Sequence, residues 1–67
     1  MNPDRLKAIR KAAAPDMTQA AYARALGYVD QDAYRKYESG SRPVPTLLAK
    51  LAEMIEDHGL PEGWRRA

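Results

Sequence analysis

The segment TQAAYARALGYVDQDAYRKYES, residues 18–39, decides the fold of this 67-residue chain. It opens on Thr18, a residue type that caps helix N-termini, and continues with apolar residues at helical spacing. Gly27 follows the last of these residues, as expected where a helix ends, and Asp30 is suited to cap a second helix. The two predicted helices cover residues 18–26 and 30–39.

Further helices are predicted on both sides of this pair. The first runs from Pro3 to about residue 14, with Asn2 as its N-cap and Pro15 as the residue that stops it. Another begins near Thr46 and is closed by Gly59. Its apolar stripe consists of Leu47, Leu48, Leu51, Ala52 and Ile55. A last helical turn is expected over residues 61–66.

The composition supports an all-α fold and excludes several classes of protein. Alanine occurs twelve times, valine twice and phenylalanine never, so helix formers dominate. The chain has no cysteine and one histidine, which excludes disulfides and predicts no metal site. No apolar run approaches the ~18 residues of a membrane helix, and the start lacks the pattern of a signal peptide. We expect a single cytoplasmic domain, residues 1–67, built as a compact bundle of four to five short helices.

The charge is spread unevenly, although the net charge is only +2. Residues 1–50 contain nine Lys and Arg against five Asp and Glu, a net charge of +4. Residues 51–67 contain two basic residues and four acidic residues, which gives a net charge of −2. A basic body is compatible with binding a polyanion. The sequence predicts no enzyme, cofactor or small-molecule ligand, because it has no histidine pair, no Gly-rich phosphate loop and too little volume for a pocket of the usual ~300–1,000 Å³.

Two short helices joined by about three residues, with a glycine at the joint, form a helix-turn-helix, whose second helix can enter the major groove of DNA. The residues around the joint also resemble a known family. The matching residues are Thr18-Gln19-x-x-x-Ala23-x-x-Leu26-Gly27 and Tyr37-Glu38-x-Gly40-x-Arg42-x-x-Pro45. They are similar to the Cro/repressor-type (Xre-like) helix-turn-helix over about residues 6–57. The resemblance implies a lambda-repressor-like bundle and a transcriptional regulator that binds double-stranded operator DNA, usually as a homodimer.

The chain departs from the family's pattern in a few places. The leucine usual in the second helix is Tyr22, and the inward aliphatic residue of the following helix is Tyr34. One residue is added between Gly27 and Glu38 relative to the commonest spacing, and the loop over residues 12–17 is long. These differences bear on how the bundle would sit on DNA.

Four polar residues of the second helix of the motif are candidates for reading bases. They are Gln31, Asp32, Arg35 and Lys36. Glutamine pairs with adenine and arginine with guanine, whereas aspartate accepts a hydrogen bond from the amino group of cytosine. The alternative is an ordinary solvated helix face. The helix-turn-helix context favours DNA contact for Gln31 and Arg35 and leaves both interpretations open for Asp32 and Lys36, while Asp30 is expected to act as the helix cap.

Five residues are candidates for contacts with DNA phosphates. They are Thr18, Gln19, Tyr28, Ser41 and Arg42. The resemblance implies that the start of the helix over residues 18–26 lies against the phosphate backbone, where helix amides and the Gln19 side chain can donate. It implies the same for Ser41 and Arg42, which otherwise form a solvated loop. Thr18 can be a cap with or without such a contact, and Tyr28 can bind a phosphate or shield the core.

Other residues are expected to have structural roles. In the family, an arginine of the first helix often meets the glutamate after the recognition helix, which implies an ion pair between Arg10 and Glu38. Guanidinium and carboxylate groups fit each other bidentately. Trp64 can complete the core or seal a dimer interface, where tryptophan is enriched. Leu60 is a further candidate for that interface.

The sequence supports two functions from different classes. The first is a sequence-specific regulator, a small repressor that acts as a homodimer on a pseudo-palindromic operator with half-sites roughly 34 Å apart. The alternative is a protein-interaction module, antitoxin-like or an adaptor, for which DNA binding is secondary or lost. The near-neutral charge and the aspartates at the start of the recognition helix motivate this alternative. A salt series separates the two functions. An affinity that falls steeply as the salt concentration rises would indicate DNA binding through phosphates.

Overall fold

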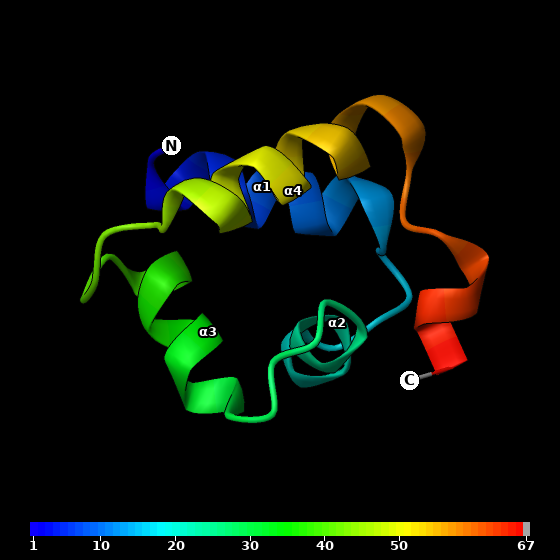
Figure 1. Cartoon of the computed structure of the whole chain (residues 1–67), viewed down its shortest axis with the longest axis horizontal. Coiled ribbons are helices and arrows are strands. Elements are labelled where there is room, and N and C mark those ends of the chain that lie inside the picture. The colour runs from blue at the N-terminus through cyan, green and yellow to red at the C-terminus, as the bar shows by residue number, and fades with distance from the viewer. Residues whose placement is uncertain (67) are drawn as a thin grey trace.

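The computed structural model describes the backbone of residues 1–66 and the side chains of residues 1–65. Within that range the chain forms four α-helices and a final 3-10 helix (Figure 1). These elements are α1 (Pro3–Ala13), α2 (Gln19–Ala25), α3 (Gln31–Ser39), α4 (Thr46–His58) and η1 (Glu62–Arg66). The expected all-α bundle is confirmed, and each observed boundary lies within one residue of the expected one. None of the helices in residues 1–66 is long and apolar enough to cross a membrane.

Helix α1 packs against two of the other three α-helices. This helix packs along α4 on one side and against α3 on another, while α2 packs against α3 and η1 (Figure 1). In the view of Figure 1, α1 and α4 run along the top of the molecule and α2 and α3 lie below them. Thus α1 joins the helix-turn-helix pair to the rest of the bundle.

Side-chain caps fix the starts of the first three helices, as the sequence predicts. The Asn2 side chain accepts a hydrogen bond from the backbone N–H of Arg5 at 2.7 Å. Thr18 and Asp30 accept from backbone N–H groups three and two residues further on, both at 3.0 Å. Each cap satisfies a donor that the first turn of a helix leaves unpaired. The predicted role of Asp30 as a cap is therefore confirmed.

Gly27 makes the turn between α2 and α3 possible. Its φ is +99°, in the left-handed region that residues with a β-carbon rarely adopt. Its N–H donates to the carbonyl of Arg24 at 2.9 Å, and the N–H of Tyr28 donates to the carbonyl of Ala23 at 3.0 Å. These bonds close the end of α2 and let the chain turn into α3.

The core contains two tyrosines that are fully buried. Tyr22 and Tyr34 are both 0 % exposed, and their ring centroids lie 5.9 Å apart. Tyr28 extends this aromatic cluster, with ring centroids 5.6 Å from Tyr34 and 6.1 Å from Tyr37. The remaining buried residues of the core are Leu6, Ile9, Ala14, Ala23, Leu48, Ala52 and Ile55. Burial raises the pKa of Tyr22 to about 12, so the phenol is neutral in the folded protein.

One residue of the predicted stripe on α4 lies outside the core, and the structure decides against one of the two roles considered for Trp64. Leu47 is 82 % exposed, although Leu48 beside it is buried. Adjacent residues of a helix point about 100° apart, and here Leu48 points toward the core whereas Leu47 lies outside the contact with the neighbouring helices. Trp64 is 36 % exposed and does not belong to the core cluster, so it does not complete the core. Leu60 packs against the core.

We expect Gly27→Ala to lower the free energy of unfolding by about 1–2 kcal/mol, because alanine is strained in the left-handed region. The added β-carbon itself meets no atom within 4 Å. Urea unfolding followed by far-UV circular dichroism measures the effect. Gly63→Ala is the matched control, since its β-carbon also meets nothing and its φ is not positive. Equal stability of the two variants would show that the turn does not need a glycine.

Candidate nucleic-acid interface

A buried carboxylate, Glu38, lies where α1, α2 and α3 meet. Its side chain is 3 % exposed. Arg10 on α1 donates to it twice, from Nε to Oε2 at 2.8 Å and from Nη2 to Oε1 at 3.1 Å. Gln19 at the start of α2 donates from Nε2 to Oε1 at 3.0 Å. One side chain of α3 is thereby joined to both neighbouring helices, and the expected pair of Arg10 and Glu38 forms a bidentate ion pair.

The surroundings of Glu38 keep it charged. Burial alone would raise the pKa of this carboxyl. The hydrogen bonds and positive charge of Arg10 act in the opposite direction, as does the hydrogen bond from Gln19. The resulting pKa of Glu38 lies below its ordinary value of 4.5. The hydrogen bond to Glu38 likewise raises the pKa of Arg10. Because the pKa of Glu38 is lowered on folding, its contribution to stability is present above about pH 4.5 and is lost as the pH falls through the lower, folded value.

The outer face of α3 forms part of a continuous polar surface. A shallow hollow on this face is lined by Asp32, Arg35, Lys36 and Ser39. An adjoining hollow shares Arg35 and Ser39 with the first and adds Lys7 of α1 and Gln19 of α2. Three helices thus contribute to one surface that projects the cations Lys7, Arg35 and Lys36. We call it the α3 surface.

An ion pair on the α3 surface sets the position of its central arginine. Arg35 Nη2 lies 2.8 Å from Asp32 Oδ1, one helical turn away, and both side chains are mostly exposed. Exposed pairs contribute little to stability. The pair lies along the helix, and the charge of Asp32 partly offsets that of Arg35.

The other base-reading candidates differ in exposure. Lys36 is exposed beside Arg35, and the two side chains line the same hollow. Gln31 is half-buried at the first position of α3 and does not line either hollow of the α3 surface. Of the four candidates, the structure brings together Asp32, Arg35 and Lys36.

Four of the five phosphate candidates lie at the two ends of the recognition motif. Thr18 and Gln19 are at the start of α2, where Gln19 contacts Glu38. Ser41 follows α3, with its hydroxyl 3.0 Å from that of Ser39. The N–H of Arg42 donates to the carbonyl of Lys36 at 3.2 Å, so this loop folds back onto the C-terminus of α3.

The fifth phosphate candidate, Tyr28, does not join them. Its ring packs in the aromatic cluster with Tyr34 and Tyr37, and burial raises its pKa. It lines an apolar hollow together with Leu26 and Leu47. This position agrees with a role in shielding the core.

Lys7 and Ser39 belong to the α3 surface but are not predicted from the sequence. Lys7 lies three residues before Arg10, and residues at this spacing share a face of a helix. Once the ion pair of Arg10 with Glu38 is expected, this spacing places Lys7 above α3. Ser39 lies four residues after Arg35 and shares its face in the same way.

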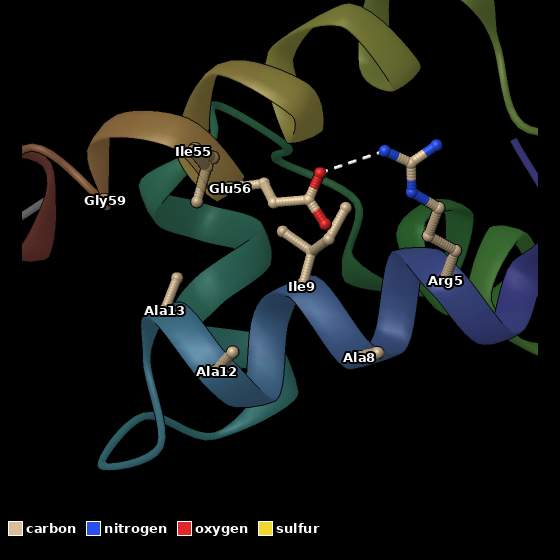
Figure 2. Close-up of a pocket in the computed structure, with 8 residues that line it drawn as sticks. All are labelled: Arg5, Ala8, Ile9, Ala12, Ala13, Ile55, Glu56 and Gly59. Carbon is tan, nitrogen blue, oxygen red and sulfur yellow. Dashed lines mark hydrogen bonds and ion pairs between the residues drawn. The ribbon is translucent and has the colours of Figure 1, made fainter.

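A separate hollow lies between α1 and α4 and is not part of the α3 surface. It has a volume of about 510 Å³. Figure 2 shows that α1 lines it with small side chains, Ala8, Ala12 and Ala13, and that Arg5 and Glu56 meet across it. These two side chains form an exposed ion pair at 2.9 Å. In residues 1–66 no group of His, Asp or Glu is arranged to hold a metal ion.

Comparison with known proteins gives one match. The family model described as "Helix-turn-helix" matches residues 6–56, which include most of α1, all of α2 and α3, and nearly all of α4. No curated protein and no solved structure gives a match.

We expect Arg10→Ala to lower the free energy of unfolding by about 3–5 kcal/mol, because it leaves Glu38 buried without its cation. A domain of this size has a net stability of only about 3–5 kcal/mol, so the variant should be largely unfolded in water. Circular dichroism and urea titration measure this. Arg5→Ala is the control, since it breaks an exposed ion pair and should change stability little. Similar losses in both variants would contradict a special role for Glu38.

Proposed function

The chain belongs to the Cro/repressor-type (Xre-like) helix-turn-helix family of DNA-binding regulators, and from this premise we propose that it is a small repressor that acts as a homodimer on a pseudo-palindromic operator. The observation that carries the proposal is the α3 surface. It presents three cations from two helices on one side of a helix that is anchored to the bundle through the buried Glu38.

In this proposal α3 lies in the major groove. The groove accommodates an α-helix and presents a distinct donor and acceptor pattern for each base pair. In the proposed complex Arg35 reads a guanine bidentately, and Asp32 accepts from a cytosine amino group. Because these two side chains are already paired at 2.8 Å, Asp32 aims the guanidinium before DNA arrives. Lys36 and Gln31 are the other proposed readers.

Phosphate contacts flank the recognition helix on both sides. At the start of α2, Gln19 uses one amide hydrogen on Glu38 and keeps the second for a phosphate. Lys7 lies in the same hollow and adds a cation. Beyond α3, Ser41 and Arg42 are the proposed contacts to the backbone on the other side. Contacts of this kind fix the register of a protein on DNA and make binding depend on salt.

Fluorescence anisotropy tests the proposal directly. The titration uses a duplex taken from upstream of the protein's own gene, with a scrambled duplex as control, at two salt concentrations. Tight binding to the first duplex, weakened by salt, supports an autoregulating repressor. Absence of binding to either duplex would instead favour the protein-interaction module, and the search would turn to a partner protein.

We expect Arg35→Ala to reduce discrimination at one base position of the operator by about 1–3 kcal/mol, because it removes a base contact. Anisotropy titrations with operators substituted at each position locate the effect. If the variant weakens binding to every sequence equally, Arg35 contacts a phosphate and does not read a base.

We expect Arg42→Ala to weaken binding uniformly across sequences and to reduce the slope of log K against log salt by about one unit. A salt series on the operator and on the scrambled duplex measures both effects. Arg5→Ala removes the same charge from a side chain paired with Glu56 on α4, so it should leave the slope unchanged. Equal slopes in Arg42→Ala and the wild type would place Arg42 off the DNA.

A further inference from the structure

An acidic residue, Asp32, lies among the cations of the α3 surface. Its side chain is 70 % exposed, that of Arg35 is 64 % exposed, and both line the hollow that also includes Lys36. The position is unfavourable for contact with a DNA phosphate, because a carboxylate and a phosphate repel each other. If Asp32 takes part in binding, it therefore acts on a base or through a neighbouring side chain.

The start of α3 fixes where the Asp32 carboxylate can act. Asp30 caps the helix and accepts a hydrogen bond from the backbone N–H of Asp32 at 3.0 Å. The carboxylate of Asp32 itself lies one helical turn before Arg35, and its Oδ1 accepts from Arg35 Nη2 at 2.8 Å. Negative charge in the first turn of a helix is favourable, so Asp32 is compatible with the fold while it lowers the positive charge of the α3 surface.

Arg35 keeps enough donors to bind a guanine while it is paired with Asp32. A guanidinium has five N–H donors in one plane. One of them, on Nη2, is donated to Asp32, and the other four are left for further partners. A bidentate contact with O6 and N7 of guanine needs two. The contact with Arg35 uses one oxygen of the carboxylate, Oδ1, so Oδ2 can accept from a cytosine amino group at the same time.

A phosphate and a guanine differ in how they meet this pair. The acceptors O6 and N7 of guanine carry no net charge, so they share the guanidinium with Asp32 without repulsion between like charges. A phosphate oxygen that binds Arg35 brings a negative charge close to the Asp32 carboxylate, and the energy of that repulsion grows as the distance falls. The ion pair therefore weakens the contact of Arg35 with a phosphate more than its contact with a guanine.

We propose that Asp32 determines specificity by opposing phosphate binding at Arg35, so that this arginine reads a guanine. Specificity is a difference between two affinities, and a group that repels the wrong partner increases it as well as a group that attracts the right one. The proposal rests on the proposed function, since it takes α3 to be the helix that meets DNA. It adds that Asp32 lowers the affinity for DNA that lacks the matching guanine.

Anisotropy titrations of the Asp32→Asn variant test this role with three labelled probes. They are the duplex from upstream of the protein's own gene, the scrambled duplex, and polyphosphate, which carries phosphates without bases. We expect the variant to bind the scrambled duplex and polyphosphate about three- to tenfold more tightly, and the ratio of affinities between the two duplexes to fall. The slope of log K against log salt on the scrambled duplex should steepen by about one unit, because Arg35 then neutralises a phosphate.

Two control variants separate the ion pair from the net charge and from helix stability. Asp57→Asn removes the same charge from an exposed residue of α4 that lines neither hollow of the α3 surface, so it should change each affinity by less than about twofold. Asp32→Glu keeps a carboxylate one turn from Arg35 and should preserve the ratio of affinities. Circular dichroism checks that every variant has the helix content of the wild type.

The double variant Asp32→Asn, Arg35→Ala shows whether Asp32 acts through Arg35. In the Arg35→Ala background, Asp32→Asn should have no larger effect than Asp57→Asn has in the wild type. No gain in affinity in Asp32→Asn, an equal gain in Asp57→Asn, or the same gain with and without Arg35 would overturn the proposal. Failure of the proposed function is distinguishable: the wild type then binds both duplexes equally, and the titration with polyphosphate alone decides whether Asp32 opposes phosphate binding.

Discussion

The bidentate ion pair between Arg10 and Glu38 determines how the recognition helix is held. Two charges removed from water are costly, and the cost is offset here by good geometry and by a third hydrogen bond from Gln19. Since the three side chains come from α1, α3 and α2, a single carboxylate fixes the mutual orientation of all three helices. The α3 surface is built from these same helices, so its shape follows from this contact.

The aromatic cluster joins α2, α3 and the turn between them. Tyr22 and Tyr34 are both fully buried, with ring centroids 5.9 Å apart. Tyr28, in the turn between α2 and α3, packs against the rings of Tyr34 and Tyr37. Rings of this size need contact area on several sides, and the turn supplies one of those sides.

Features that depend on local chemistry could be predicted from the sequence, whereas those that depend on packing could not. Caps at Thr18 and Asp30, and the left-handed Gly27, follow from residue type and spacing alone, and the structure has all three. Periodicity could not decide between Leu47 and Leu48, because both fit an apolar stripe and only the position of the neighbouring helices separates them. The contribution of Lys7 to the α3 surface follows from its spacing to Arg10 only once the contact of Arg10 with Glu38 is known.

Positive and negative side chains are concentrated on different parts of the molecule. The cations of the α3 surface lie on the helix-turn-helix side, while the acidic residues of positions 51–67 lie on the second half of α4 and on η1. Figure 1 shows this second half and η1 at the opposite side of the molecule from α3. A polyanion attracts one side and repels the other, which steers encounters toward the productive orientation. A net charge of +2 is therefore compatible with DNA binding, because the separation of charge, more than its sum, acts at the interface.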